Sequence, residues 1–440
     1  MRDILLLLFT VSMSLLAVGR PLIGMLTFVG FGNLGPQSLT WGVARTFPHS
    51  QVIGLATIIG FSLTRDAKWF PREREAMIML ALWIVFAMST LFALEPELAR
   101  QKLVFVSKLF LMMFLCTAIV NTSERLQALV RTIALSLGFY AVKLGLFVLA
   151  TGFREKAYGP EGTYLWGENV IGIALAVNVP LLVYLRRIER RRSLRLAAGV
   201  MALLSYPAVI GTFSRGAWLS LAAVSVVLIA ESWRRVVAIA AVLSVVATAG
   251  LWHGSLVSDR LVARYDSLVN FEEDGSAQSR FWNWEFCRRV GLARPFGGGF
   301  ELYSTEAYAE FYPEFLTRWP GKVWTCHSMW MVFLGEHGVL GFALGVALMG
   351  SCVCSLRRLS RTVRGRPTQI TELARMLTAS FVGFMTGGTF LDVAYHELLY
   401  QLVAIVIVAK AVWQRHSPPE SVHEIVGDSG TSGRPEWVAS

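Results

Sequence analysis

The sequence has few charged residues for its length. Only 16% of its 440 residues are Asp, Glu, Lys or Arg, whereas 54% are hydrophobic, and a soluble protein carries about a quarter charged residues. This composition excludes an ordinary soluble domain. Many apolar runs are long enough to cross a bilayer core about 30 Å thick. The fold class predicted is therefore an all-α polytopic membrane protein.

Nucleotide motifs, a cysteine framework and internal repeats are also absent. No Walker-type loop or dinucleotide fingerprint occurs. The five cysteines, an odd number, give no disulfide framework; Cys287 and Cys326 share one segment, but their spacing does not require a bridge and we do not expect one. The missing repeats weigh against an inverted-repeat transporter.

The formal net charge of +11 comes from short basic runs between apolar segments. They lie at 186–195, 233–235 and 357–366. This is the positive-inside pattern, which sets orientation and needs no nucleic-acid partner. Placing these runs in the cytoplasm puts the connections 152–168, 211–215, 253–326 and 391–397 outside.

Thirteen apolar segments are found, at 4–18, 21–31, 51–63, 76–94, 102–120, 127–151, 169–185, 195–211, 216–231, 236–252, 327–354, 370–391 and 398–413. Parity favours about twelve transmembrane helices, with residues 3–31 crossing once as two pieces broken at Pro21. Both termini are then cytoplasmic. The domains expected are helices 1–10 in 1–252, a periplasmic lobe in 253–326, the last helices and final span region in 327–416, and a disordered cytoplasmic tail in 417–440.

The segment 253–326 is unlike the other loops. Loops of more than about 15 residues are usually functional or disordered, and this one is too rich in Trp, Tyr and Phe to be disordered. We expect one large, partly helical external loop.

Two arginines on the external side are candidates for binding an anion. Arg215 lies in the turn Gly211–Gly216, and Arg280 follows the possible helix start Asp274–Ser279. An interface-anchoring arginine and a solvated helix arginine are the structural alternatives. Further on, Gly298 belongs to a glycine triple that indicates unusual backbone geometry or close approach.

His327 lies where the chain re-enters the membrane. Its reference pKa near 6.5 suits proton transfer at neutral pH, although a lone histidine is more often structural. Glu336 and His337 are secondary candidates that need polar partners inside the membrane. Ten residues of helix rise about 15 Å, so the two histidines cannot share one metal ion.

The topology places Arg215, Arg280 and His327 on one side of the membrane. Arginine forks match phosphate oxygens and stabilise a departing diphosphate. Two arginines and a histidine therefore suit a lipid-linked diphosphate donor and a reacting hydroxyl.

These residues resemble a known family. The run HSMWMVFLGEHGVLG, from His327 and Ser328 to Gly338 and Gly341, is similar to the His-[Asn/Ser/Gln]-x9-Gly-x-x-Gly signature of the O-antigen ligase and polymerase superfamily. The Ser214–Ala217 turn and the GSAQSR…Pro-x-Gly-x-Gly segment resemble two more landmarks, and Glu168–Asn169 a weaker one. The N-terminal part is similar to the exosortase A-associated O-glycosylation ligase branch.

The resemblance implies a GT-C-like glycosyltransferase of the bacterial inner membrane with a periplasmic active site. It would transfer a glycan from undecaprenyl diphosphate to an acceptor hydroxyl with inversion, and without metal, nucleotide or other cofactor. Arg215 and Arg280 would hold the diphosphate, and His327 would activate or orient the hydroxyl. The leading expectation is an O-antigen ligase acting on the lipid A–core of lipopolysaccharide. A polymerase, a protein O-glycosylation ligase and a lipid-linked glycan transporter are the alternatives.

Overall fold

The computed structural model describes residues 1–64, 71–230, 275–361 and 369–416. Within these residues the regular secondary structure is helical, and the β-type pairing is one isolated bridge between Gly159 and Gly167. Eight helices are long and apolar enough to cross a membrane: α1 (Arg2–Gly19), α5 (Arg74–Leu91), α6 (Pro96–Ile119), α7 (Ser123–Ala150), α8 (Glu168–Ile188), α9 (Arg192–Ile210), α16 (Met329–Arg361) and α18 (Glu397–His416).

The remaining helices complete this part of the chain. Three are short and apolar: α2 (Pro21–Leu34), α4 (His49–Leu63) and α10 (Arg215–Ala230). The others are η1 (Pro36–Leu39), α3 (Val43–Thr46), α13 (Gly275–Ala293), α14 (Thr305–Phe311), α15 (Pro313–Arg318) and α17 (Gln369–Gly388). The prediction of an all-helical polytopic membrane protein is thus confirmed. The count of twelve crossings stays a prediction, because the expected span 236–252, the start of the lobe and the tail 417–440 lie outside the described residues.

The first two helices form an antiparallel hairpin. The rings of Phe9 and Phe31 pack with centroids 5.8 Å apart. A Cβ on Gly42, after α2, would lie 2.3 Å from the Asp3 carboxylate. The start of α1 and the loop after α2 therefore lie at the same end of the molecule. The prediction that 3–31 cross only once is wrong.

The lobe face is the end of the molecule where the loops 35–48, 92–95, 151–167, 211–214, 294–328 and 389–396 gather. Arg45 pairs with Glu161 at 3.0 Å. The amide of Ala157 donates to the carbonyl of Gly211 at 2.8 Å. The amide of Leu94 donates to the carbonyl of Gly298, also at 2.8 Å. These contacts join loops that are far apart in the sequence.

The opposite face holds the other helix ends. Near the end of α18, Arg415 donates to the carbonyl of Asn121, between α6 and α7, at 3.1 Å. Lys410 pairs with the Glu75 carboxylate at 2.6 Å. The first and last described residues thus lie at opposite faces, which differs from the prediction that both termini share one side; the tail 417–440, on which that prediction also depends, lies outside the described residues. The α1–α2 hairpin accounts for the difference.

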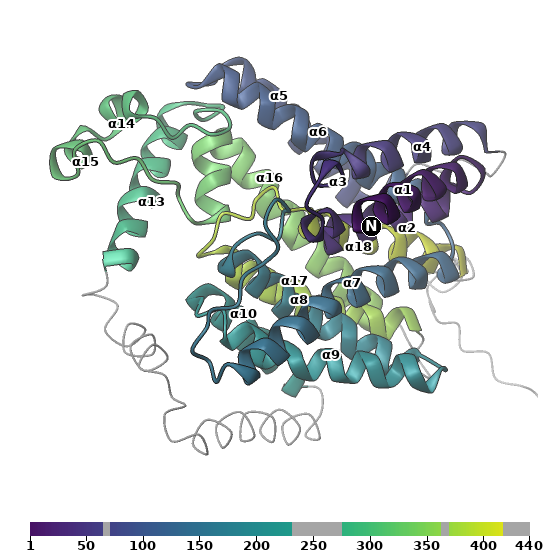
Figure 1. The fold of residues 1–440 in the computed structure, drawn as a ribbon. Coiled ribbons are helices and arrows are strands. Elements are labelled where there is room, and N and C mark those ends of the chain that lie inside the picture. The colour runs from purple at the N-terminus through teal and green to yellow at the C-terminus, as the bar shows by residue number, and fades with distance from the viewer. Residues whose placement is uncertain (65–70, 231–274, 362–368, 417–440) are drawn as a thin grey trace, which may run out of the picture.

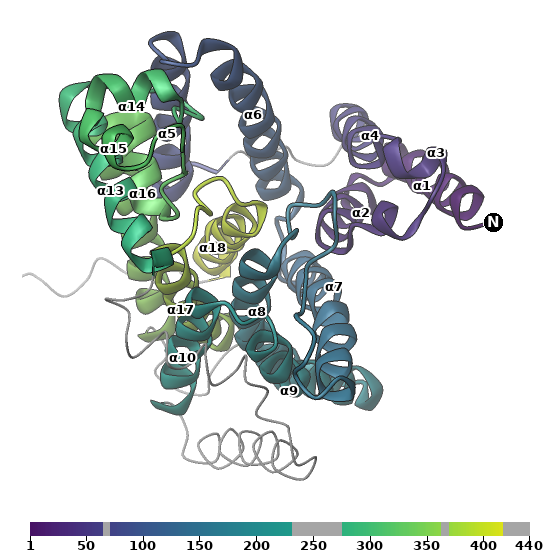
Figure 2. The same cartoon turned by 60° about the vertical axis from the view of Figure 1, so that its left-hand side comes forward.

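The lobe, residues 275–328, lies at one side of the lobe face (Figures 1 and 2). Its core is aromatic: Phe286 stacks on Tyr308 with centroids 3.8 Å apart, and the Tyr308 hydroxyl donates to the carbonyl of Trp324 at 2.9 Å. Helix α13 packs closely on α16, because a Cβ on Gly335 would lie 2.9 Å from Cys287. The lobe is therefore anchored to the helix that follows it.

Candidate functional site

Arg215 is the first residue of α10 and is only 6% exposed. The turn before it is tight: Phe213 has a left-handed φ of 56°, and the Thr212 hydroxyl accepts from the Ser214 amide at 3.2 Å. The Ser214 hydroxyl in turn accepts from the Ala217 amide at 3.3 Å, as an N-cap does. The turn thus fixes an arginine at a helix N-terminus, where backbone and side chain both favour an anion.

Glu168 and Asn169 begin α8 beside this turn. One turn further along α8, a Cβ on Gly172 would lie 2.6 Å from the side chain of Ala217. Glu168 pairs with Lys156 at 2.7 Å. The weaker predicted landmark is therefore next to the Arg215 turn.

Helix α13, which carries Arg280, is tied to the segment before α16 by three links. Cys287 and Cys326 form a disulfide. The Trp284 indole donates to the carbonyl of Cys326 at 2.9 Å, and the side-chain Nδ2 of Asn283 donates to the carbonyl of Thr325 at 3.1 Å. The prediction that these cysteines remain unbridged is wrong, because the fold of the lobe brings together residues 39 apart.

His327 directly follows the tied segment. It is exposed to solvent, while its neighbours Cys326 and Ser328 are buried. Its φ of 47° is left-handed, a conformation that costs a non-glycine residue about 1–3 kcal/mol. Desolvation by neighbouring groups, and then the positive charge of Arg280, lower the pKa of His327. The imidazole is thus neutral near pH 7 and close enough to Arg280 to feel its charge.

The loop 389–396 connects the two arginine sites. A Cβ on Gly216 would lie 3.6 Å from the Phe390 side chain. The Phe390 ring faces Trp284, one turn after Arg280, with centroids 6.3 Å apart. The Trp330 indole donates to the Thr389 hydroxyl at 3.1 Å. Through this loop, the structure brings the neighbourhoods of Arg215, Arg280 and His327 together.

Glu336 and His337 lie deeper, in a continuous hydrogen-bonded chain. The Tyr395 hydroxyl lies 2.5 Å from the Glu336 carboxyl and 2.6 Å from His337 Nε2. The Ser89 hydroxyl is 2.7 Å from His337 Nδ1. The Glu301 amide donates to the Glu336 carboxyl at 3.1 Å. Glu336 and His337 therefore have the polar partners that we expected such side chains to need inside the membrane.

The glycine triple has a packing role. Helix α16 is kinked at Gly338, with φ 67° and ψ −171°, which frees two carbonyl groups of the preceding turn. The amides of Gly298 and Gly299 donate to the carbonyls of Gly335 and Glu336 at 2.8 and 2.9 Å. Gly298, a secondary candidate from the sequence, thus supplies a backbone donor to the kink.

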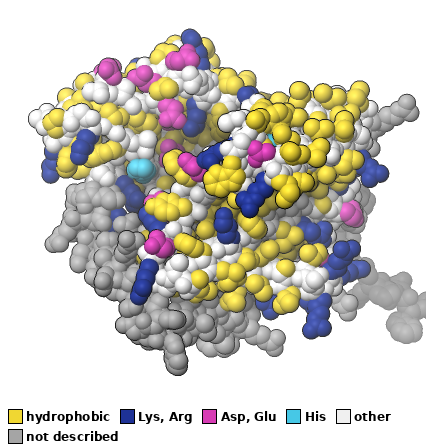
Figure 3. All heavy atoms as spheres, viewed as in Figure 1, with side chains coloured by type: hydrophobic (Ala, Val, Ile, Leu, Met, Phe, Trp, Pro, Cys, Tyr) yellow, Lys and Arg dark blue, Asp and Glu magenta, His cyan; other side chains and the backbone are white. Residues whose placement is uncertain are grey.

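The sequence analysis missed a group of charged residues beside the hydrogen bonds of Glu336, Tyr395 and His337. Lys102 pairs with Glu301 at 2.8 Å and lies over the Tyr395 ring, 5.8 Å from its centroid. Desolvation raises the pKa of Asp392 to about 6, with Lys102 opposing this shift and Glu301 adding to it. Asp392 could have been noted as a charged residue in a short external connection. Figure 3 shows acidic and basic side chains gathered on this face between the lobe and the largely hydrophobic α1–α4 region.

Two family matches cover most of the chain. Residues 1–190 match a family described as "Family of unknown function (DUF5935)", and residues 200–346 match one described as "O-Antigen ligase". The second match spans Arg215, Arg280, His327 and the kink. No curated protein matches the chain.

Proposed function

We propose that this chain, a member of the O-antigen ligase superfamily by its residues 200–346, is an O-antigen ligase. It would transfer a glycan from undecaprenyl diphosphate to the lipid A–core oligosaccharide and so complete lipopolysaccharide. The superfamily membership predicted from the sequence is confirmed by the match. The donor, the acceptor and the residue roles are our proposal.

The proximity of Arg280 to His327 carries this proposal. His327 directly follows Thr325 and Cys326, which two hydrogen bonds and the disulfide tie to the helix that bears Arg280. Transfer from a lipid diphosphate needs positive charge for the leaving group and an acceptor for one proton. Arg280 and Arg215 provide the charge, and the neutral, exposed imidazole of His327 provides the proton acceptor.

In the reaction, an acceptor hydroxyl oxygen attacks the anomeric carbon from the side opposite the diphosphate. The new carbon–oxygen bond forms as the bond to the diphosphate oxygen breaks, so the configuration inverts. The hydroxyl proton passes to His327, and the arginines stabilise the charge that develops on the diphosphate. No cofactor enters the scheme.

The orientation proposed puts the lobe face in the periplasm of a bacterial inner membrane. The disulfide supports this, since disulfides persist in oxidising compartments. Arg186, Arg187, Arg357 and Arg358 lie toward the opposite face and suit the cytoplasm. The N-terminus is then periplasmic and the end of α18 cytoplasmic.

The test uses purified full-length protein, an undecaprenyl-diphosphate glycan and lipid A–core in detergent. A shifted lipopolysaccharide band is expected, and Arg280→Ala should abolish it. Arg288→Ala is the matched control, because Arg288 lies on the same helix and pairs at the surface with Glu285 at 2.7 Å.

The products distinguish the alternatives. Lengthening of the lipid-linked glycan with an unmodified acceptor would identify a polymerase. Modification of an added protein hydroxyl alone would identify a protein O-glycosylation ligase. Glycan movement across vesicles without bond formation would identify a transporter and overturn the enzyme assignment.

A further inference from the structure

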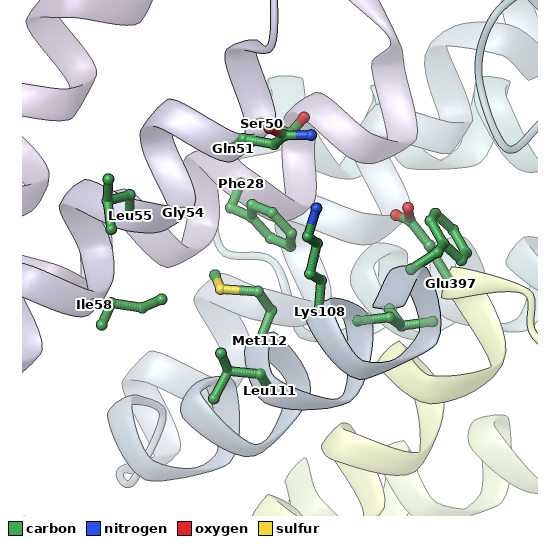
Figure 4. Close-up of a pocket in the computed structure, with 12 residues that line it drawn as sticks. Phe28, Ser50, Gln51, Gly54, Leu55, Ile58, Lys108, Leu111, Met112 and Glu397 are labelled. Carbon is green, nitrogen blue, oxygen red and sulfur yellow. The ribbon is translucent and has the colours of Figure 1, made fainter. Parts of the chain in front are cut away.

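A groove lies between α4 and α6, away from the helices that carry the arginines and His327. Phe28 of α2 contributes to its wall, and Glu397, the first residue of α18, closes one end (Figure 4). Its volume is about 430 Å³. None of its lining residues comes from α8, α10, α13 or α16, so it is separate from the candidate transfer site.

The groove is polar at one end and apolar at the other. Lys108 and Glu397 are its charged lining residues, with Gln51 beside them. Figure 4 shows the Lys108 ammonium and the Glu397 carboxylate at the same side of the groove, whereas Leu55 and Ile58 lie away from them. This polarity is that of an amphiphile, with a head group at one end and a hydrocarbon chain at the other.

The two charged groups have no protein partner in the part of the chain that the structure describes. Among the described residues, neither Lys108 nor Glu397 makes an ion pair or hydrogen bond. Lys108 lies twelve residues into the 24-residue helix α6, about 18 Å along its axis, and it is exposed on the groove side. A charge at such a depth is costly unless it is paired. The groove therefore calls for a ligand that supplies the missing counter-charges.

We propose that the groove binds a zwitterionic membrane phospholipid whose head group carries a phosphate and a primary ammonium. The phosphate pairs with Lys108, and the ammonium pairs with Glu397. One acyl chain lies along Leu55, Ile58 and Met112. The lining charges sum to zero, which matches this head group better than a lipid diphosphate or a purely anionic lipid.

The bound lipid joins two parts of the molecule. It fills the space between α4, which belongs to the N-terminal helices, and α6, which belongs to the main bundle. A Cβ on Gly54 would lie 3.6 Å from the sulfur of Met112, so the two helices are in van der Waals contact at this point of the groove. The lipid thus stabilises the attachment of the N-terminal helices.

The experiment measures lipid retention on delipidated, full-length protein. Dioleoyl phosphatidylethanolamine, phosphatidylglycerol and phosphatidylcholine are added in turn, and bound lipid is counted by native mass spectrometry. Thermal unfolding is followed in parallel. Phosphatidylethanolamine should be retained at least fivefold more than the other two and should raise the unfolding temperature most. Lys108→Met and Glu397→Gln should each remove this preference.

Lys143→Met is the matched control, because Lys143 is another exposed lysine within a span, α7, but does not line the groove. It should leave retention unchanged. The double variant Lys108→Glu/Glu397→Lys keeps the charges balanced and should recover the preference that each single exchange loses. Equal retention of phosphatidylglycerol, displacement by undecaprenyl diphosphate at equimolar ratio, or unchanged retention in Lys108→Met would overturn the proposal. These readouts involve no glycan transfer, so they stand apart from the proposed function.

Discussion

Two histidines ten residues apart lie in very different surroundings. His327 is exposed, strained and next to an arginine charge. His337 is completely buried, with both ring nitrogens partnered by Tyr395 and Ser89. A reactive base needs an accessible lone pair, whereas a structural histidine needs saturated hydrogen bonds. The difference shows that one motif holds two distinct environments, and it supports the proposal that His327 takes part in the reaction while His337 has a structural role.

The sharpest test of this comparison replaces each histidine by alanine. His327→Ala should lower transfer by about 10²–10⁴-fold, the usual contribution of a general base, without changing the unfolding temperature. Initial rates of lipopolysaccharide formation and thermal unfolding in detergent would show it. If His327→Ala kept full transfer while His337→Ala alone lost it, the roles assigned above would be exchanged.

The second test removes the tie that positions His327. Cys287→Ser/Cys326→Ser should lower transfer by about 10- to 100-fold, because small misplacements of catalytic groups have effects of this size, and should lower the unfolding temperature as well. Cys354→Ser, at an exposed free cysteine, is the control. If the double serine variant transferred glycan as fast as a Cys354→Ser protein in which the Cys287–Cys326 disulfide is formed, the hydrogen bonds from α13 would suffice to hold the segment before His327.

The third test concerns the buried chain. His337→Ala or Tyr395→Phe leaves buried polar groups without a partner, which costs about 1–3 kcal/mol. Both should lower the unfolding temperature, and transfer per folded molecule should fall only a few-fold. If either variant lost as much transfer as His327→Ala while its stability stayed unaltered, the hydrogen-bonded side chains around His337 would have a catalytic role.

The smallest effect is a shift in the titration of His327. After desolvation, the Arg280 charge is the second cause that lowers the pKa of this residue, so Arg280→Gln should raise this pKa, and protonation would then begin at higher pH. The pH dependence of modification by diethyl pyrocarbonate, taken as the difference from His327→Ala, measures it. Arg288→Gln should leave the titration in place, and an equal shift in both variants would contradict a specific Arg280 effect.

Much of the architecture could be predicted from the sequence because it depends on local composition. The apolar runs marked the described spanning helices, and the basic runs marked one face. The hairpin of α1 and α2 was missed because two short apolar segments in sequence are compatible with one broken transmembrane helix or with two antiparallel helices. Only contacts such as Phe9 with Phe31 decide between them.

The candidate site was predictable in part for the same reason. Arg215, Arg280 and His327 were selected by residue type and position, and the structure brings their neighbourhoods together. The disulfide, Asp392 and the partners of Glu336 were not, since each depends on tertiary contacts between distant segments. The role of Gly298 in closing the kink is likewise set by the neighbouring helix, which a local pattern of glycines does not reveal.

The buried chain also has a consequence for biogenesis. Glu336 and His337 are synthesised almost 60 residues before Tyr395, their shared partner. While translation continues, α16 must enter the bilayer with two polar side chains that have only Ser89 and the Glu301 amide available. Polypeptides that stop before Tyr395 therefore leave both side chains without their shared partner inside the membrane, where an unpaired polar group is costly. The loop 389–396 thus completes the polar contacts of α16 late in synthesis.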